Sequence, residues 1–411
     1  MKKVKSVSLS IPIFIVLLFY QCSSGRYDLV IQNGTVYDGS GTAAVSADIG
    51  IKDGSIIKIA EKIKPKESLL IDAGKMIVAP GFIDIHTHCD SELLKEGMND
   101  VRNYLMQGVT SVVTGNCGGG TYEVDRFFKK LDSIGTGTNI IHLVGHNTIR
   151  REVMGMEDRK PTDEELERMK EMLKKGMEEG AAGFSTGLWY TPGAYSSTDE
   201  VVELTKVAKE YGGIYATHIR DESNYSVGLK EAVREAISIG GQTGIKVQIS
   251  HIKAGAPLWG ISEEICKMIE EAKENGINIF ADQYPYNASS TSLAAVLLPA
   301  RVLADGKMKE RLQDTELLPQ IKKEITVNFD RAGGPEGLII ASYNHDRSLD
   351  GKNFSEISNI KNMSVVEAAI DLLLNGNPSV VSFNMKESDV INFMKKDYVM
   401  TCSDGHIFKP E

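Results

Sequence analysis

Short apolar runs alternate with amphipathic segments over most of this chain. We expect strands at residues 77–85, 111–114, 139–144, 183–186, 213–218, 246–250, 277–281 and 398–401. The segments between them repeat apolar residues at helical spacing, and three of them begin with a capping-box pair, at Thr162 and Glu165, Ser197 and Glu200, and Ser364 and Glu367. Strands that alternate with helices in this way predict a parallel sheet with helical crossovers.

Eight such repeats in 411 residues favour an α/β fold, a TIM-type (β/α)8 barrel, over an open doubly wound sheet. No Gly-x-Gly-x-x-Gly follows the first strand, which disfavours a dinucleotide-binding sheet. We assign residues 76–411 to the barrel. The stretch from Tyr286 to Tyr398 is too long for one crossover, so we expect an insert at about residues 290–350.

A small β-region precedes the barrel at residues 28–75. Its short runs end in the turn signals Asn33-Gly34 and Asp53-Gly54, which favour hairpins. We expect a small, β-sandwich-like domain here.

The first 22 residues are predicted to be a signal peptide. Lysines precede an apolar stretch that ends at Tyr20 and is too short for a comfortable membrane span. The segment resembles a bacterial lipoprotein signal, with cleavage before Cys22, a lipid anchor on its thiol and a tether at residues 23–27. Export follows, as a periplasmic protein or a membrane-anchored lipoprotein. Gln21 and Tyr20 depart from the small residues of that pattern, so a plain signal peptide or an uncleaved anchor is the alternative.

The charge balance argues against nucleic-acid binding. The net charge is −10, and Lys and Arg form no long run after the N-terminus. Nothing in the distribution of Lys and Arg suggests polybasic docking to anionic lipid either.

Histidines gather where a barrel places its catalytic groups, at the carboxyl ends of the strands. Of the eight histidines, those at such ends are His86, His88, His146, His218, His251 and His406. His86 and His88 are one residue apart, so in a strand they share a face, which is a metal-ligand arrangement. Two other strand ends carry Cys117 and Asp404.

A thiolate and two imidazoles suit Zn²⁺ with an open fourth position. We therefore predict one tight zinc ion on Cys117, His218 and His251. His86 and His88, with Asp404, either hold a second, weaker ion or orient Asp404. Zinc lowers the pKa of bound water, and Asp404 is placed to act as general base and then as general acid.

These motifs resemble the amidohydrolase superfamily and, within it, the D-aminoacylase (N-acyl-D-amino-acid deacylase) family. The superfamily pattern of His-x-His, two further histidines and an aspartate is matched by His86, His88, His218, His251 and Asp404. Many members bridge two metals with a carboxylated lysine, whereas the D-aminoacylases use a cysteine in Gly-Asn-Cys-Gly, here Cys117. The likeness extends over nearly all of residues 27–405.

The resemblance also implies substrate contacts from Lys253, Tyr190 and Ser290. Lys253 is suited to a substrate carboxylate, and Tyr284 to the developing oxyanion. The family continues beyond Asp404 with a His-Pro-Arg segment whose arginine binds the amino-acid carboxylate. This chain stops at Glu411, so the resemblance implies that the C-terminal part is missing.

The remaining polar residues at strand ends are expected to be structural. We predict that His146 lies behind the site, that Arg220 pairs with Asp221, and that His406 belongs to a loop.

The leading hypothesis is zinc-dependent hydrolysis of the amide bond of N-acyl-D-amino acids, which gives a carboxylate and a D-amino acid. A cyclic-amide hydrolase of the dihydroorotase or hydantoinase type is the neighbouring alternative, and Cys117 argues against it. A non-catalytic, truncated, metal-binding surface lipoprotein is the third hypothesis.

Overall fold

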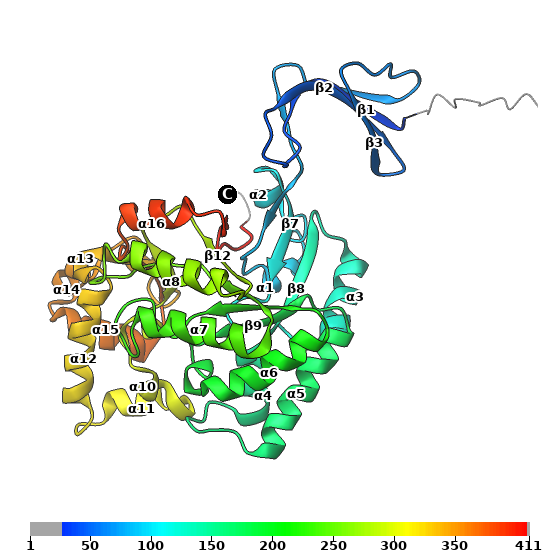
Figure 1. Ribbon diagram of the computed structural model, residues 1–411. Helices are drawn as coiled ribbons and strands as arrows, with labels where there is room; N and C mark the ends of the chain where they lie inside the picture. Colours follow the sequence, from blue (N-terminus) through cyan, green and yellow to red (C-terminus); the bar gives the residue numbers. More distant parts are fainter. Residues whose placement is uncertain (1–26, 409–411) are drawn as a thin grey trace, which may run out of the picture. The chain divides into compact units, whose positions relative to one another are not determined.

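The structure, a computed structural model, describes residues 27–408 (Figure 1). The predicted signal peptide, including Cys22, lies outside the described residues. The chain divides into two compact units between Pro80 and Gly81. Among residues 27–408, no helix combines the length and apolar character that a membrane crossing needs.

The first unit is one five-stranded sheet. Its strands are β1 (Leu29–Val36), β2 (Val45–Lys52), β3 (Ser55–Ala60), β4 (Leu69–Asp72) and β5 (Ile77–Val78). They run in the order β3-β2-β1-β4, with β5 also paired to β1. In the described residues the small β-region is a single sheet, where a sandwich-like arrangement was predicted. The run 77–85, predicted as one strand, is divided at Pro80, which has no N–H to donate to a ladder.

The second unit contains eight parallel strands, each hydrogen-bonded to the next. They are β6 (Phe82–Asp84), β7 (Val109–Thr114), β8 (Asn139–Gly145), β9 (Gly183–Gly187), β10 (Ile214–His218), β11 (Lys246–Ile249), β12 (Ile279–Gln283) and β16 (Val399–Thr401). The first and eighth strands meet just beyond their carboxyl ends, where the N–H of His88 donates to the carbonyl of Gly405 at 2.8 Å. The predicted (β/α)8 barrel is confirmed.

Helices cover the outside of the barrel (Figure 1). They are α1 (Asp90–Leu93), α2 (Arg102–Leu105), α3 (Val124–Ile134), α4 (His146–Met154), α5 (Asp163–Glu178), α6 (Thr198–Glu210), α7 (Leu229–Thr243), α8 (Ser262–Glu274) and α16 (Glu387–Met394). Thr162 and Glu165 form the predicted capping box of α5. Ser197 caps α6, but the carboxylate of Glu200 turns inward to His146 and Arg150.

Between β12 and β16 the chain makes a long excursion, residues 289–382. It has a three-stranded antiparallel sheet of β13 (Ser289–Ser292), β15 (Ser379–Ser382) and β14 (Leu338–Ser342), in that order. Its helices are α9 (Leu293–Leu297), α10 (Ala300–Leu303), α11 (Met308–Gln313), α12 (Leu318–Arg331), α13 (Gly334–Gly337), α14 (Phe354–Lys361) and α15 (Val365–Asn375). The predicted insert, 290–350, is shorter than the excursion, because the middle strand of this sheet lies at 379–382.

Candidate metal centre

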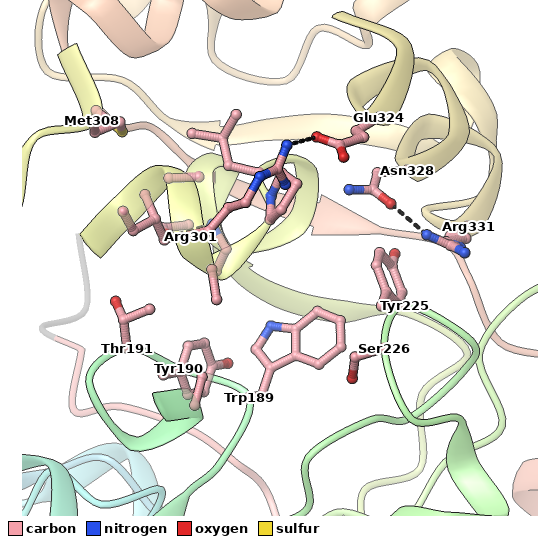
Figure 2. A pocket seen from close by; sticks show the side chains of 18 of the residues that line it. Trp189, Tyr190, Thr191, Tyr225, Ser226, Arg301, Met308, Glu324, Asn328 and Arg331 are labelled. Atoms are coloured by element: carbon pink, nitrogen blue, oxygen red, sulfur yellow. Dashed lines mark hydrogen bonds and ion pairs between the residues drawn. The ribbon is translucent and has the colours of Figure 1, made fainter. Parts of the chain in front are cut away.

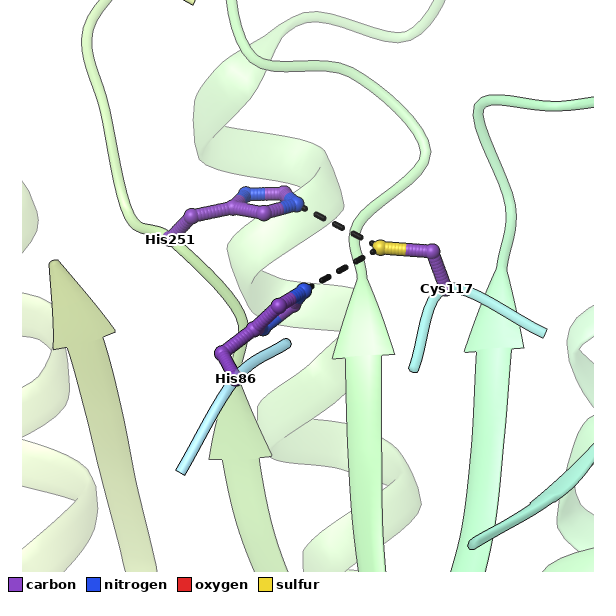
Figure 3. Close-up of side chains that lie close together, drawn as sticks. All are labelled: His86, Cys117 and His251. Carbon is purple, nitrogen blue, oxygen red and sulfur yellow. Dashed lines mark hydrogen bonds between the residues drawn. The ribbon is translucent and has the colours of Figure 1, made fainter. Parts of the chain in front are cut away.

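The thiol of Cys117 lies among three imidazoles at the carboxyl ends of the strands. Its Sγ is 3.5 Å from Nε2 of His86, 3.6 Å from Nδ1 of His218 and 3.5 Å from Nε2 of His251. Figure 3 shows His86 and His251 aimed at this sulfur from one side. The predicted trio of Cys117, His218 and His251 is thus brought together, and His86 joins it.

The carboxylate of Asp404 lies at the same nitrogen of His86 as the sulfur of Cys117. Oδ1 of Asp404 is 3.4 Å from Nε2 of His86 and 3.1 Å from Nε2 of His88. Among the described residues, the groups spaced to hold a metal ion are His86 with Cys117 and His251, His86 with His88 and Asp404, and His218 with Glu222 and His251. His86 therefore belongs to two neighbouring ligand groups.

Three of these side chains are presented by left-handed backbone. The φ angle is 51° at Cys117, 34° at His251 and 52° at Asp404, in a region that residues other than glycine seldom adopt. The loop around Cys117 depends on glycine as well. Gly115 has a φ of 84°, and a Cβ there would collide with the carbonyl of Leu143. Such conformations gather at functional sites.

Electrostatics favour anionic ligands in this cluster. Burial opposes the thiolate of Cys117, but the neighbouring imidazoles outweigh it and hold the pKa of that thiol well below its ordinary value. Burial also opposes the carboxylate of Asp404, yet the charges of the histidines around it lower its pKa. The carboxylate of Asp404 is therefore ionised at neutral pH, and the site favours the thiolate form of Cys117.

The imidazoles respond to the same charges. Burial disfavours the cationic form of His88, but hydrogen bonds with Asp404 and Cys117 raise its pKa to about 10. Asp404 and Cys117 likewise raise the pKa of His251 to about 9, against the opposing effects of burial and Lys253. Without metal, protons compensate the anionic groups that a divalent cation would otherwise compensate.

The donor set fits zinc. Thiolate and imidazole are the ligands that zinc prefers, and carboxylate suits a second ion. The nitrogens that face the sulfur of Cys117 are Nε2 of His86, Nδ1 of His218 and Nε2 of His251. An ion held by these residues would stabilise their shared orientation.

Two carboxylates that sequence reasoning did not assign orient the ligands. Oε1 of Glu222 lies 3.1 Å from Nδ1 of His251, and its Oε2 lies 3.5 Å from Nε2 of His218. Oδ1 of Asp282 lies 3.4 Å from Nδ1 of His86. A carboxylate behind a ligating histidine fixes its ring and raises its basicity. Two sequence signals could have indicated these roles. Glu222 follows His218 by four residues, and Asp282 is an acidic residue at the end of an apolar strand.

The predicted substrate-contact residues share one cavity with the ligands. A cavity of about 740 Å³ is lined by Lys253, Tyr284, Ser290 and Tyr190 together with Cys117, His218, His251 and Asp404. Nζ of Lys253 donates to Glu222 at 2.5 Å. The buried hydroxyl of Tyr284 has no partner among the described residues, and burial together with nearby carboxylates raises its pKa well above the usual value. It is therefore a protonated donor without an acceptor.

The predictions for the remaining strand-end residues agree with the structure in some cases and not in others. His146 lies behind the site, fully buried, with Nε2 2.8 Å from Glu200. The predicted pair of Arg220 with Asp221 is wrong. Arg220 pairs with Glu235 at 2.8 Å, while the carboxylate of Asp221 accepts backbone N–H groups of its own loop. The ring of His406 stacks 5.7 Å from that of His88, at the cavity wall.

Sequence comparison identifies the class. The profile of the amidohydrolase family matches residues 69–317, so the chain belongs to the amidohydrolase family. Within it, the chain is similar to D-aminoacylases. It is 37% identical over 309 residues to the D-aminoacylase of Alcaligenes xylosoxydans xylosoxydans, covering 69% of this chain and 63% of the relative. It is 34% identical over 299 residues to the N-acyl-D-glutamate deacylase of the same organism, covering 67% and 59%. The chain thus spans less than two thirds of these relatives' length.

Solved structures agree with this placement. The N-acyl-D-glutamate deacylase of Bordetella bronchiseptica, complexed with zinc and a phosphonate that mimics the tetrahedral intermediate, has a TM-score of 0.76 at 30% identity, covering 92% of this chain and 76% of that one. A D-aminoacylase described by its binuclear metal centre, with one-metal activation and second-metal attenuation, has the same TM-score and the same coverage at 27% identity.

Proposed function

We propose that this chain hydrolyses the amide bond of N-acyl-D-amino acids with zinc, giving a carboxylate and a D-amino acid. One observation carries the proposal: the thiol of Cys117 lies among three imidazoles, with the carboxylate of Asp404 beside them in an accessible cavity. The relatives that are named as deacylases of N-acyl-D-amino acids support it.

Cys117, His218 and His251 would hold the tight ion, with His86 at its edge. His86, His88 and Asp404 would hold the second, weaker ion. When bound, zinc would lower the pKa of a water molecule enough to supply a nucleophile near neutral pH. It would also polarise the substrate carbonyl that this water attacks. Glu222 and Asp282 keep the ligating rings in place through their distal nitrogens.

Asp404 is the general base and then the general acid. Its carboxylate is ionised in the resting site, because the surrounding histidines lower its pKa. It can therefore take a proton from the attacking water. Cleavage of the C–N bond needs a proton on the leaving nitrogen, and the protonated Asp404 returns it there.

The cavity residues position the substrate. Tyr284 is suited to donate its unpartnered O–H to the developing oxyanion. Lys253 is suited to the carboxylate of the amino acid, held ready by Glu222. Ser290 and Tyr190 line the same cavity, and the ring of Tyr190 packs edge-on against His218 at 4.8 Å.

The test is an assay of zinc-loaded protein on N-acetyl-D-amino acids, N-acetyl-L-amino acids and a cyclic amide. We expect release of free D-amino acid, and a fall of about 10²- to 10⁴-fold in Asp404→Asn, the size of a lost general base. Turnover of the cyclic amide alone would favour a dihydroorotase-like enzyme. Bound zinc without turnover of any compound would favour the non-catalytic alternative.

We further propose that the chain is exported and anchored by lipid at Cys22, on the strength of the lipoprotein-like signal in its first residues. Expressed in a bacterium, the wild type should fractionate with membranes and Cys22→Ala should not. Equal distribution of the two proteins would contradict the anchor.

A further inference from the structure

A second cavity, of about 890 Å³, adjoins the metal pocket. It lies between the loops that follow β9 and β10 and the excursion helices α9 to α12 (Figure 2). Trp189, Tyr190 and Tyr225 line both cavities. We propose that it is a subsite for elongated acyl groups that end in a carboxylate. The inference rests on the proposed function and extends it to the acyl side of the substrate.

Part of the lining of this cavity is apolar. Leu188 and Trp189 contribute from the barrel, and Ala295, Leu298 and Val327 from the excursion. A methylene chain gains stability from leaving water for such walls, at about 0.8 kcal/mol for each buried CH₂. The volume is within the range of small-molecule sites.

The cavity also offers an arginine without a counter-ion among the described residues. Arg331 donates from Nε to Oδ1 of Asn224 and from Nη1 to Oδ1 of Asn328, both at 2.8 Å, and its guanidinium lies 5.0 Å over the ring of Tyr225. Within residues 27–408 it makes no ion pair. These two bonds use two of the five N–H donors of the guanidinium, which leaves donors for an incoming anion.

The other arginines of the cavity are already neutralised. Arg220 pairs with Glu235 at 2.8 Å and Arg301 with Glu324 at 2.6 Å. Figure 2 shows the ion pair of Arg301 with Glu324 and the hydrogen bond of Arg331 to the amide oxygen of Asn328. Arg331 is therefore the arginine of this cavity that is suited to a carboxylate.

The position of Arg331 indicates that the acyl group is the part of the substrate that reaches it. Two rings separate it from His218: Arg331 lies over Tyr225, Tyr225 packs against Trp189 at 4.6 Å, and Trp189 stacks 6.4 Å from His218. An anion bound to Arg331 would lie on the far side of these two rings from His218. The α-carboxylate is assigned to Lys253 in the first cavity, so the acyl group is the part of the substrate directed here.

The test compares N-acetyl, N-octanoyl and N-suberyl derivatives of one D-amino acid. The last two have acyl chains of equal length, and only suberyl ends in a carboxylate. We expect the wild type to prefer suberyl to octanoyl in kcat/KM. Arg331→Gln should reduce that ratio by about 10- to 100-fold, the size of a charged hydrogen bond. Ala295→Phe should lower the ratio of both long chains to acetyl by filling the apolar part.

The matched control is Arg168→Gln, an exposed arginine on α5 outside both cavities, which should leave the suberyl-to-octanoyl ratio unchanged. Hydrolysis of the acetyl compound with no change of this ratio in Arg331→Gln would overturn the inference and leave the proposed function standing.

Binding can be measured without turnover. The chain has two tryptophans, and Trp259 lines neither cavity, so Trp259→Phe leaves Trp189 as the only indole fluorophore. We expect octanoate to change its emission at lower concentration than octanamide, which has the same chain without the charge, and Arg331→Gln to remove the difference. Equal affinities would overturn the subsite, whether or not the protein proves to be a hydrolase.

Discussion

Two walls enclose the metal pocket, and they bury different kinds of side chain. The barrel wall carries buried charge at Asp282, Lys253 and the Arg150–Glu200 pair, besides its histidines. Within residues 289–382, the excursion buries no charged side chain, and its core is almost wholly apolar. The wall that carries the candidate metal ligands is thus a polar interior, while the excursion wall is an ordinary apolar body.

The two walls also pack separately. One core cluster joins barrel strands to their helices, around Phe184 and Tyr215. Another lies inside the excursion, around Phe329 and Phe354. We therefore expect substitutions on the barrel side to change turnover of every substrate, and substitutions on the excursion side to change choice among substrates.

The largest expected effect is that of Cys117→Ala. This variant removes the thiolate nearest to three imidazoles, so the tight zinc should be lost and turnover should cease for every acyl group. Elemental analysis after dialysis measures the metal. Cys266→Ala, at a buried cysteine in α8 outside the site, is the control. Full zinc retention in Cys117→Ala would refute the ligand assignment.

Glu222→Gln should have a smaller effect of the same kind. It keeps the shape of the side chain but removes the charge beside His218, His251 and Lys253, so zinc affinity or activity should fall by about 10- to 100-fold. Zinc competition with a chelator measures the affinity. An unchanged affinity and turnover would mean that this carboxylate does not orient the ligands.

On the excursion side, Phe354→Ala should cost about 3–5 kcal/mol of local stability, as expected for a fully buried phenylalanine. Its ring packs edge-on to Phe329 at 5.2 Å. Hydrogen exchange should show faster opening of α12 and α14, with protection of barrel strands and zinc content retained. Equal loss of protection in both bodies would show that they unfold as one.

The smallest expected effect is the pH dependence of the stability that Glu200 contributes to the barrel. Burial opposes the ionised form of Glu200, but His146 and Arg150 outweigh it and lower the pKa of that carboxyl below 4.5. The ionised group therefore stabilises the native barrel above that pH, and this contribution is lost as pH falls through the lower native pKa. The stability gap between wild type and Glu200→Gln should narrow on acidification. Denaturant unfolding of both proteins measures it, and a constant gap would contradict the assignment.

The barrel was predictable because its signals are local. Each strand and helix shows its own periodicity, and parallel strands necessarily bring their carboxyl ends together, so residues as distant as His86 and Asp404 could be placed in one site. The partners of those residues were not predictable. Whether Arg220 pairs with Asp221 or Glu235, or whether Glu222 turns toward His251, depends on side-chain directions that spacing does not encode.

The excursion shows the same limit at the level of strands. Its middle strand, β15, pairs with β13 from about ninety residues earlier in the chain, and no turn motif links the two. Strand pairing between residues so far apart in the chain has no local sequence pattern that would predict it. The end of the insert was therefore misplaced, although the insert itself was inferred from the length of the crossover.

The left-handed backbone at Cys117, His251 and Asp404 has a consequence for protein engineering. Transplanting the ligand side chains alone onto another barrel would give loops that relax to ordinary conformations and turn the donor atoms away from one another. A graft should carry whole segments, beginning with Gly115 to Gly118, whose glycines hold the cysteine in its unusual conformation. In this fold the loop backbone and the ligand residue that it presents should be transferred together as one segment.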